Sequence, residues 1–208
     1  MQILCIGDSN TWGYNPEDGS QHTNRWTKVL AGLMPENKII EEGMCGRTLL
    51  TVDPYEPQWC GIDTLPGIID AHKTADIVVV MLGTNELKTE FKCSAEYIAQ
   101  GIEAFVKMLQ NPYSWESGRI PRILIVSPIL LRDEIVVKGG ICDQFDKNGL
   151  EQSKQMAQKI RNVCESYGVE FMDAARFAEA SLTDAIHMDE VNHIKLGNAI
   201  YQKLCEII

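Results

Sequence analysis

The sequence lacks closely spaced cysteine pairs, and it has few basic residues compared with its acidic ones. The first feature argues against disulfide-rich and zinc-ribbon proteins, and the second against proteins that bind nucleic acids or anionic membranes. Its seven cysteines are odd in number and form no Cys-x-x-Cys pair, which argues against a disulfide framework and a zinc ribbon. The chain has 19 basic and 29 acidic residues, a formal net charge of −10 at pH 7. Because an acidic surface repels phosphate backbones and anionic lipid heads, we expect neither nucleic-acid binding nor membrane binding.

Long apolar runs, phosphate loops and metal-ligand clusters are also missing. No stretch approaches the roughly 20 continuous apolar residues of a membrane span, and Met1 leads directly into a predicted strand instead of a signal peptide. The first predicted strand is not followed by Gly-x-Gly-x-x-Gly, and no Walker-type glycine loop occurs. We therefore expect a cytoplasmic protein with reduced thiols, no cofactor and no metal.

Short apolar segments alternate with longer amphipathic ones along the 208 residues. The length predicts a single domain over residues 1–208. Three of the apolar segments are nearly continuous, which is typical of strands buried on both faces, whereas segment 38–42 is more polar and fits a sheet edge. The alternation predicts a three-layer α/β/α sandwich around a flavodoxin-like five-stranded parallel sheet of order 2-1-3-4-5. The predicted strands are 2–6, 38–42, 76–82, 122–127 and 169–173.

The segments between the strands carry helix signals. Ser94 is suited to capping one helix, and Gly168 to ending another that covers residues 152–167. The predicted apolar stripe of the last helix consists of Val191, Ile194, Ala199 or Ile200, Leu204 and Ile207.

Two further segments are harder to interpret. A weaker helix over 62–72 requires Pro66 to fall in its first turn. Residues 132–148 form a long connection, which is interpreted either as a flap over a site or as a subunit interface.

Polar residues follow the predicted strands at the points where each strand ends. In open α/β sheets, ligands bind outside the carboxyl ends of the strands. The segments at these ends place a serine, a glycine, an asparagine and an Asp/His pair on one edge, which are the components of a serine acyl-transfer site. These segments are 7–13, 43–47, 83–86, 127–130 and 184–187.

Four short motifs follow one another in order across nearly the whole chain. They are Gly7-Asp8-Ser9-Asn10, Gly46, Asn85 within Gly-Thr-Asn-Glu, and Asp184-x-x-His187. In this order they resemble the motifs of the SGNH hydrolases, also called the GDSL esterase family, with Asn10 in place of the leucine of the namesake motif. The stretches Gly-Asp-Ser-x-Thr-Trp-Gly and Met-Leu-Gly-Thr-Asn also resemble a bacterial subgroup of arylesterases and acyltransferases.

The resemblance implies a role for each motif residue. Ser9 would be the nucleophile, His187 the general base, and Asp184 the residue that orients the imidazole. The backbone N–H groups of Ser9 and Gly46 and the side-chain amide of Asn85 would form the oxyanion hole. The implied function is a serine esterase that hydrolyses short acyl groups from small esters, or transfers them to an alcohol. Acetylated carbohydrates, thioesters and lysophospholipids are alternative substrates.

Residues next to the motifs are predicted to line the substrate pocket, namely Asp8, Trp12, Cys45 and Ile129. Asp8 is better suited to accepting hydrogen bonds from backbone N–H groups of its turn than to lining a pocket. For Trp12 and Tyr14, packing in the core or at a subunit contact is as well supported as a place in the pocket. Cys45 is the alternative nucleophile, although a reactive thiolate requires an activating histidine or helix N-terminus.

Alternatives exist for the base and for the class of protein. His193 follows Asp189 by four residues, but Asp189 fits the start of the last helix and places His193 within its first turn, so we favour His187. A non-catalytic α/β module that binds a small ligand, and a flavodoxin-like flavin protein, are the rival functions. The expected partner is a small-molecule ester, and the sequence leaves a homo-oligomer open.

Overall fold

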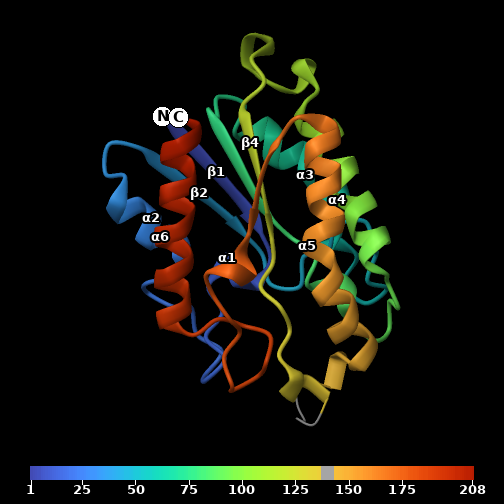
Figure 1. Ribbon diagram of the computed structural model, residues 1–208. Coiled ribbons are helices and arrows are strands. Elements are labelled where there is room, and N and C mark those ends of the chain that lie inside the picture. Colours follow the sequence, from blue (N-terminus) through green and yellow to red (C-terminus); the bar gives the residue numbers. More distant parts are fainter. Residues whose placement is uncertain (137–142) are drawn as a thin grey trace.

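A parallel β-sheet forms the centre of the computed structural model, which describes residues 1–136 and 143–208 (Figure 1). Within these residues the sheet has five strands in the order β2-β1-β3-β4-β5, and every pair is parallel. The predicted order and the edge position of the second strand are therefore confirmed. The strands are β1 Gln2–Gly7, β2 Lys38–Gly43, β3 Ile77–Met81, β4 Arg122–Ser127 and β5 Glu170–Asp173.

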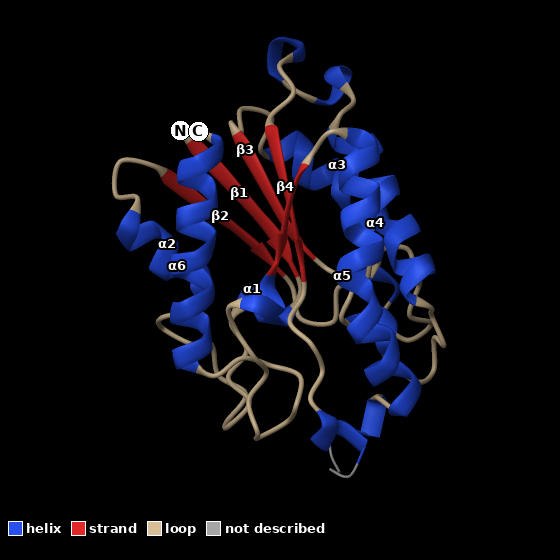
Figure 2. Ribbon diagram, viewed as in Figure 1, coloured by secondary structure: helices blue, strands red, loops and turns tan. Residues whose placement is uncertain are grey.

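Helices cover both faces of the sheet and produce the predicted three layers (Figure 2). Helices α2 and α6 pack on one face, and α3, α4 and α5 lie on the other. Among the described residues, no helix has both the length and the apolar character needed to cross a membrane. The helices are α1 Ser9–Trp12, α2 Trp26–Leu33, α3 Gly61–Ala71, α4 Ala95–Leu109, α5 Lys147–Tyr167 and α6 Glu190–Ile207.

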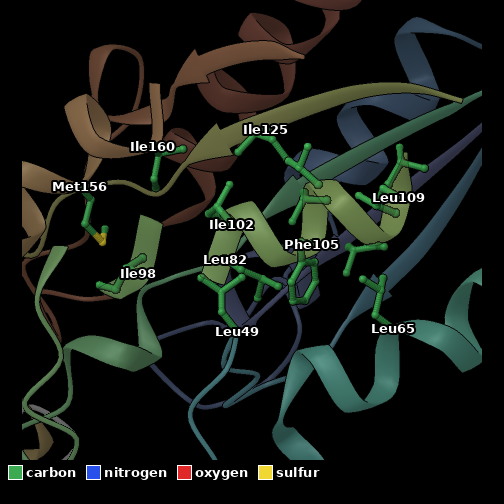
Figure 3. Close-up of a cluster of buried hydrophobic side chains, with 14 of the residues drawn as sticks. Leu49, Leu65, Leu82, Ile98, Ile102, Phe105, Leu109, Ile125, Met156 and Ile160 are labelled. Atoms are coloured by element: carbon green, nitrogen blue, oxygen red, sulfur yellow. The ribbon is translucent and has the colours of Figure 1, made fainter. Parts of the chain in front are cut away.

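The strands bury side chains on both faces because successive residues point to opposite sides. Ile3 and Cys5 belong to the core under α2 and α6, whereas Leu4 and Ile6 belong to the core under α3, α4 and α5. Figure 3 shows this second core, in which Phe105 of α4 packs among side chains from α3, α5 and the sheet. Burial on both faces explains why the central strands are continuously apolar.

Two predicted helix boundaries are confirmed and one is wrong. The Ser94 hydroxyl accepts a hydrogen bond from the Tyr97 N–H at 3.2 Å and caps α4. Gly168 ends α5 with a left-handed φ of 62°. Helix α5 begins at Lys147, earlier than predicted, because Asp146 caps it by accepting the Gly149 N–H at 2.9 Å. Of the long connection, residues 137–142 lie outside the described residues.

Two further expectations are corrected. Pro66 lies inside α3 rather than in its first turn, at an exposed position, and it supplies no N–H for the carbonyl four residues earlier. On α6, the predicted Ala199, Ile200 and Leu204 are buried, but Val191 and Ile194 are exposed. His193 and Gly197 occupy buried positions instead. An alanine Cβ at residue 197 would lie only 2.7 Å from Val29, so glycine permits close packing of α6 on α2.

Candidate active site

The carboxyl ends of the strands bring four of the five motif residues around one cavity of about 200 Å³. Ser9 begins α1 directly after β1, Gly46 lies in the loop after β2, and Asn85 opens the 3-10 turn η2 (Asn85–Leu87) after β3. His187 lies in the loop between β5 and α6, and Asp184 is buried behind it. Segments far apart in the sequence thus meet at one edge of the sheet.

Local hydrogen bonds present Ser9 at the start of α1. The Asp8 carboxylate caps the helix by accepting the Asn10 N–H at 2.9 Å, and Gly13 ends it with a φ of 90°. Asp8 is buried, and burial raises the pKa of its carboxyl to about 6 against the opposing effect of the Asn10 N–H. The cap is the structural role that the sequence offered for Asp8.

Ser9, His187 and Asp184 form a continuous hydrogen-bonded series. The Ser9 Oγ lies 2.8 Å from His187 Nε2, and His187 Nδ1 lies 2.5 Å from Asp184 Oδ2. The other Asp184 oxygen accepts the N–H groups of Ile186 and His187 at 3.0 and 2.9 Å, which fixes the loop around the imidazole. Burial favours a higher pKa for Asp184, but the hydrogen bond and charge of His187 outweigh it and hold the pKa below its usual value.

His193, the alternative base, is separated from this series. Its ring is buried beneath α2, where Nδ1 faces the Trp26 N–H at 3.4 Å. Burial lowers the pKa of His193 to about 3, with further contributions from His22 and His187. A histidine in this environment stays neutral at ordinary pH.

The motif after β3 anchors the loop after β2. The Asn85 side-chain amide donates to the Arg47 carbonyl at 3.0 Å, and the buried Glu86 carboxylate accepts the Leu49 N–H. Gly46 has a φ of 82°, a conformation that favours glycine, and a Cβ there would lie 2.6 Å from the Trp59 ring. Within the described chain, the N–H groups of Ser9 and Gly46 donate to no other group.

Aromatic and aliphatic side chains form the walls of the cavity. The Tyr14 ring lies 4.4 Å from the His187 ring between centroids. Cys45 is partly buried in the wall, and burial together with the charge of Asp8 raises the pKa of its thiol to about 11. The remaining lining residues are Trp59, Thr84, Lys88, Gln144, Phe145 and Ile186.

Three residues predicted for the pocket lie outside its lining. The Asp8 carboxylate is turned toward the backbone of α1. Ile129 packs in the core with residues of α2 and α6, and Trp12 ends α1 without reaching the cavity. Sequence reasoning missed Thr84 and Lys88, although both flank Asn85 in the chain. Trp59 ends a short 3-10 turn (Pro57–Trp59) and Phe145 lies in a loop, and neither segment carries a comparable sequence signal.

The described residues contain no group of three or more His, Cys, Asp or Glu side chains that could hold a metal ion. A parallel sheet of this order, with a Ser–His–Asp array and an asparagine amide at its carboxyl edge, is typical of esterases of the SGNH type. The sequence profile of the GDSL-like lipase/acylhydrolase family matches residues 5–202, and the chain belongs to this family. It is therefore an enzyme of the class that hydrolyses ester bonds.

Solved structures of esterases are similar over the whole chain. An inhibitor-bound aryl esterase of M. smegmatis is 30% identical and superposes with a TM-score of 0.92. The match covers 100% of this chain and 99% of that one. A carbohydrate acetylesterase from Sinorhizobium meliloti is 29% identical, with a TM-score of 0.92 and the same coverage of 100% and 99%. A search of curated proteins found no match.

Proposed function

We propose that this enzyme is a serine esterase that removes short acyl groups from small esters through an acyl-enzyme on Ser9. The observation that carries the proposal is the series from Ser9 to His187, 2.8 Å, and from His187 to Asp184, 2.5 Å. These contacts are short enough for a proton to pass between Ser9 and His187 as the hydroxyl attacks a carbonyl carbon.

The proposed mechanism assigns one step to each group. His187 Nε2 accepts the proton of the Ser9 hydroxyl, whose oxygen bonds to the ester carbon. The negative oxygen of the tetrahedral intermediate accepts hydrogen bonds from the N–H groups of Ser9 and Gly46 and from the Asn85 amide. The intermediate then expels the alcohol, which takes the proton from His187. Water repeats the sequence and releases the acid, while the ionised Asp184 stabilises the imidazolium.

The size and lining of the cavity support a short acyl group. Its volume of about 200 Å³ is below the roughly 300–1,000 Å³ of pockets for drug-sized ligands. Similarity to an aryl esterase and to a carbohydrate acetylesterase supports aryl esters and sugar acetates as substrate classes. Tyr14, Trp59 and Phe145 give the cavity aromatic walls against which an alcohol can pack, and this supports transfer of the acyl group to an alcohol as a second outcome.

We also propose that the protein is located in the cytoplasm, which is a reducing compartment. The six cysteines in the described part of the chain are free thiols, which supports this location.

Hydrolysis of p-nitrophenyl acetate, butyrate and octanoate tests the proposal. We expect the wild type to hydrolyse the two short esters and Ser9→Ala to fall to the uncatalysed rate. Ser153→Ala is the matched control, because Ser153 is buried in α5 and its hydroxyl donates to the Leu150 carbonyl at 2.7 Å. Full activity of Ser9→Ala would refute the nucleophile. Failure of the wild type to hydrolyse any ester or to react with a fluorophosphonate would favour a non-catalytic binding module.

A further inference from the structure

The wall of the cavity beside Ser9 contains an ammonium group that the proposed mechanism does not use. Lys88 directly follows η2, three residues after Asn85, and its side chain is only 7% exposed. It lines the same cavity as Ser9 and Asn85. In the proposed mechanism His187 transfers the protons and N–H groups stabilise the oxyanion, so neither step requires the positive charge of Lys88.

Lys88 has no acidic partner within residues 1–136 and 143–208. Among the described residues, no carboxylate lies within ion-pair distance of its ammonium, and its side chain makes no hydrogen bond. Residues 137–142 contain no aspartate or glutamate in the sequence, so they supply no carboxylate either. Buried lysines are rare unless they are paired. The absence of a partner is unexpected in a chain with 29 acidic residues and 19 basic ones.

Aromatic rings and the backbone hold Lys88 in place. Its Nζ lies 5.6 Å from the centre of the Trp59 ring and 5.8 Å from that of Phe91, within the range of cation–π attraction. Its backbone N–H donates to the Asn85 carbonyl at 3.2 Å. The ammonium therefore lies over aromatic rings, and Lys88 lines the same cavity as Ser9, where an ionic hydrogen bond is stronger than in bulk water.

We propose that Lys88 determines specificity by binding a carboxylate of the substrate, so that the preferred esters carry a negative charge in their acyl or alcohol part. The inference rests on the proposed esterase function and adds the chemical class of the substrate. A carboxylate near Lys88 gains a charge-assisted hydrogen bond with its ammonium, whereas a neutral ester offers no charge for it to pair with.

Matched charged and neutral esters test the inference. For the acyl part we compare mono-4-nitrophenyl glutarate with 4-nitrophenyl pentanoate, and for the alcohol part 4-acetoxybenzoate with its methyl ester. We expect Lys88→Met to lower kcat/KM about 10- to 100-fold for the charged member of one pair, mainly through KM, and less than about threefold for its neutral member. The pair that responds identifies which part of the substrate carries the carboxylate.

Two variants separate charge recognition from other effects. Lys88→Arg keeps the charge and is expected to keep the preference for the charged ester. Lys195→Met removes the same charge from an exposed position on α6 and is expected to leave every ratio unchanged. Equal effects of Lys88→Met on both members of both pairs would overturn the inference, and so would no effect on any.

The test also distinguishes failure of this inference from failure of the proposed function. Hydrolysis of the neutral esters with unchanged ratios refutes the role of Lys88 alone, whereas no hydrolysis of any ester refutes the esterase. Calorimetric titration with glutarate for the acyl part and with 4-hydroxybenzoate for the alcohol part needs no turnover and then decides the role of Lys88. We expect the wild type to bind one of the two more tightly than Lys88→Met, and equal affinities for both would overturn the inference.

Discussion

Asn10 holds the backbone on both sides of His187. Its side-chain oxygen accepts the Met188 N–H at 3.0 Å, and its amide nitrogen donates to the Ile186 carbonyl at 3.3 Å. The residue that follows Ser9 therefore fixes the loop that carries His187, although 178 positions separate Asn10 from Met188. The leucine of the namesake motif would provide neither hydrogen bond.

We expect Asn10→Leu to lose both stability and activity. The substitution leaves the Ile186 carbonyl and the Met188 N–H buried without a partner, at a cost of about 1–3 kcal/mol each. Looser positioning of His187 should also lower kcat for p-nitrophenyl acetate by about 10- to 100-fold. Urea unfolding and steady-state kinetics measure the two effects. Asn198→Leu, on the exposed side of α6, is the control, and a wild-type rate for Asn10→Leu would refute the positioning role.

Gly46→Ala tests whether the loop after β2 depends on glycine. The backbone there has a φ of 82°, and the new Cβ would meet the Trp59 ring at 2.6 Å. We expect a loss of about 1–2 kcal/mol in stability and about 100-fold in kcat, because the residue 46 N–H moves away from the oxyanion. Gly67→Ala in α3 is the control, since a Cβ there meets nothing within 4 Å, and it should stabilise the helix by about 0.5–1 kcal/mol. Unchanged kinetics of Gly46→Ala would exclude the backbone role.

Glu86→Gln should change the pH dependence of stability. Burial raises the pKa of Glu86 from 4.5 to about 7 in the folded protein. A raised pKa means that the protonated carboxyl stabilises the fold fully below about pH 4.5, and that this contribution is lost as the pH rises through about 7. We therefore expect the wild type and Glu86→Gln to match near pH 4.5, and the variant to be more stable by about 3 kcal/mol at pH 8.

Urea unfolding at both pH values measures this difference. Glu165→Gln at an exposed position of α5 controls for the loss of one charge. A constant difference between wild type and Glu86→Gln across the pH range would contradict the raised pKa.

Cys45 should be unreactive despite its place beside Gly46. Burial and the Asp8 charge raise the pKa of its thiol to about 11, so the thiolate is scarce at pH 7.5. We expect iodoacetamide to modify the exposed Cys205 well before Cys45, as read by mass spectrometry of peptides. Cys45→Ala should keep ester hydrolysis within about threefold of wild type. Loss of activity in Cys45→Ala together with full activity in Ser9→Ala would make the thiol the nucleophile.

The sequence predicts the sheet well because burial leaves a simple pattern there. Strands β1, β3 and β4 have neighbours on both sides and helices on both faces, so nearly every residue is apolar. Segment 38–42 is more polar because β2 lies at an edge, where one side of the strand has no neighbour.

Helix α6 shows where hydrophobicity misleads. Its buried face includes Gly197, which allows close approach to α2, and His193, whose ring meets the Trp26 N–H. Neither residue scores as apolar, while the exposed Val191 and Ile194 do. The other buried positions of α6 are apolar, namely Leu196, Ala199, Ile200 and Leu204, so among the buried positions the periodic pattern fails only at His193 and Gly197.

The cavity residues also fall into two groups, those that the sequence predicts and those that only the structure reveals. Ser9, Gly46 and Asn85 lie directly after strands, so their convergence follows from the topology. Trp59 and Phe145 lie outside the regular elements that can be predicted from periodicity, and reach the cavity only through the tertiary path of the chain. Lys88 was within reach of the sequence because it lies three residues beyond Asn85, but its burial without a carboxylate is visible only in the structure.

The contact between Ser9 and His187 joins residues 178 positions apart. A ribosome makes the chain from its amino end, so Ser9 is synthesised 178 positions before His187, the base of the proposed mechanism. A nascent chain, or one cut short before His187, therefore has a serine without a partner and cannot acylate it. Ester hydrolysis can thus report that synthesis has passed His187, because in the proposed mechanism it begins only when the segment that carries His187 has docked beside the first strand.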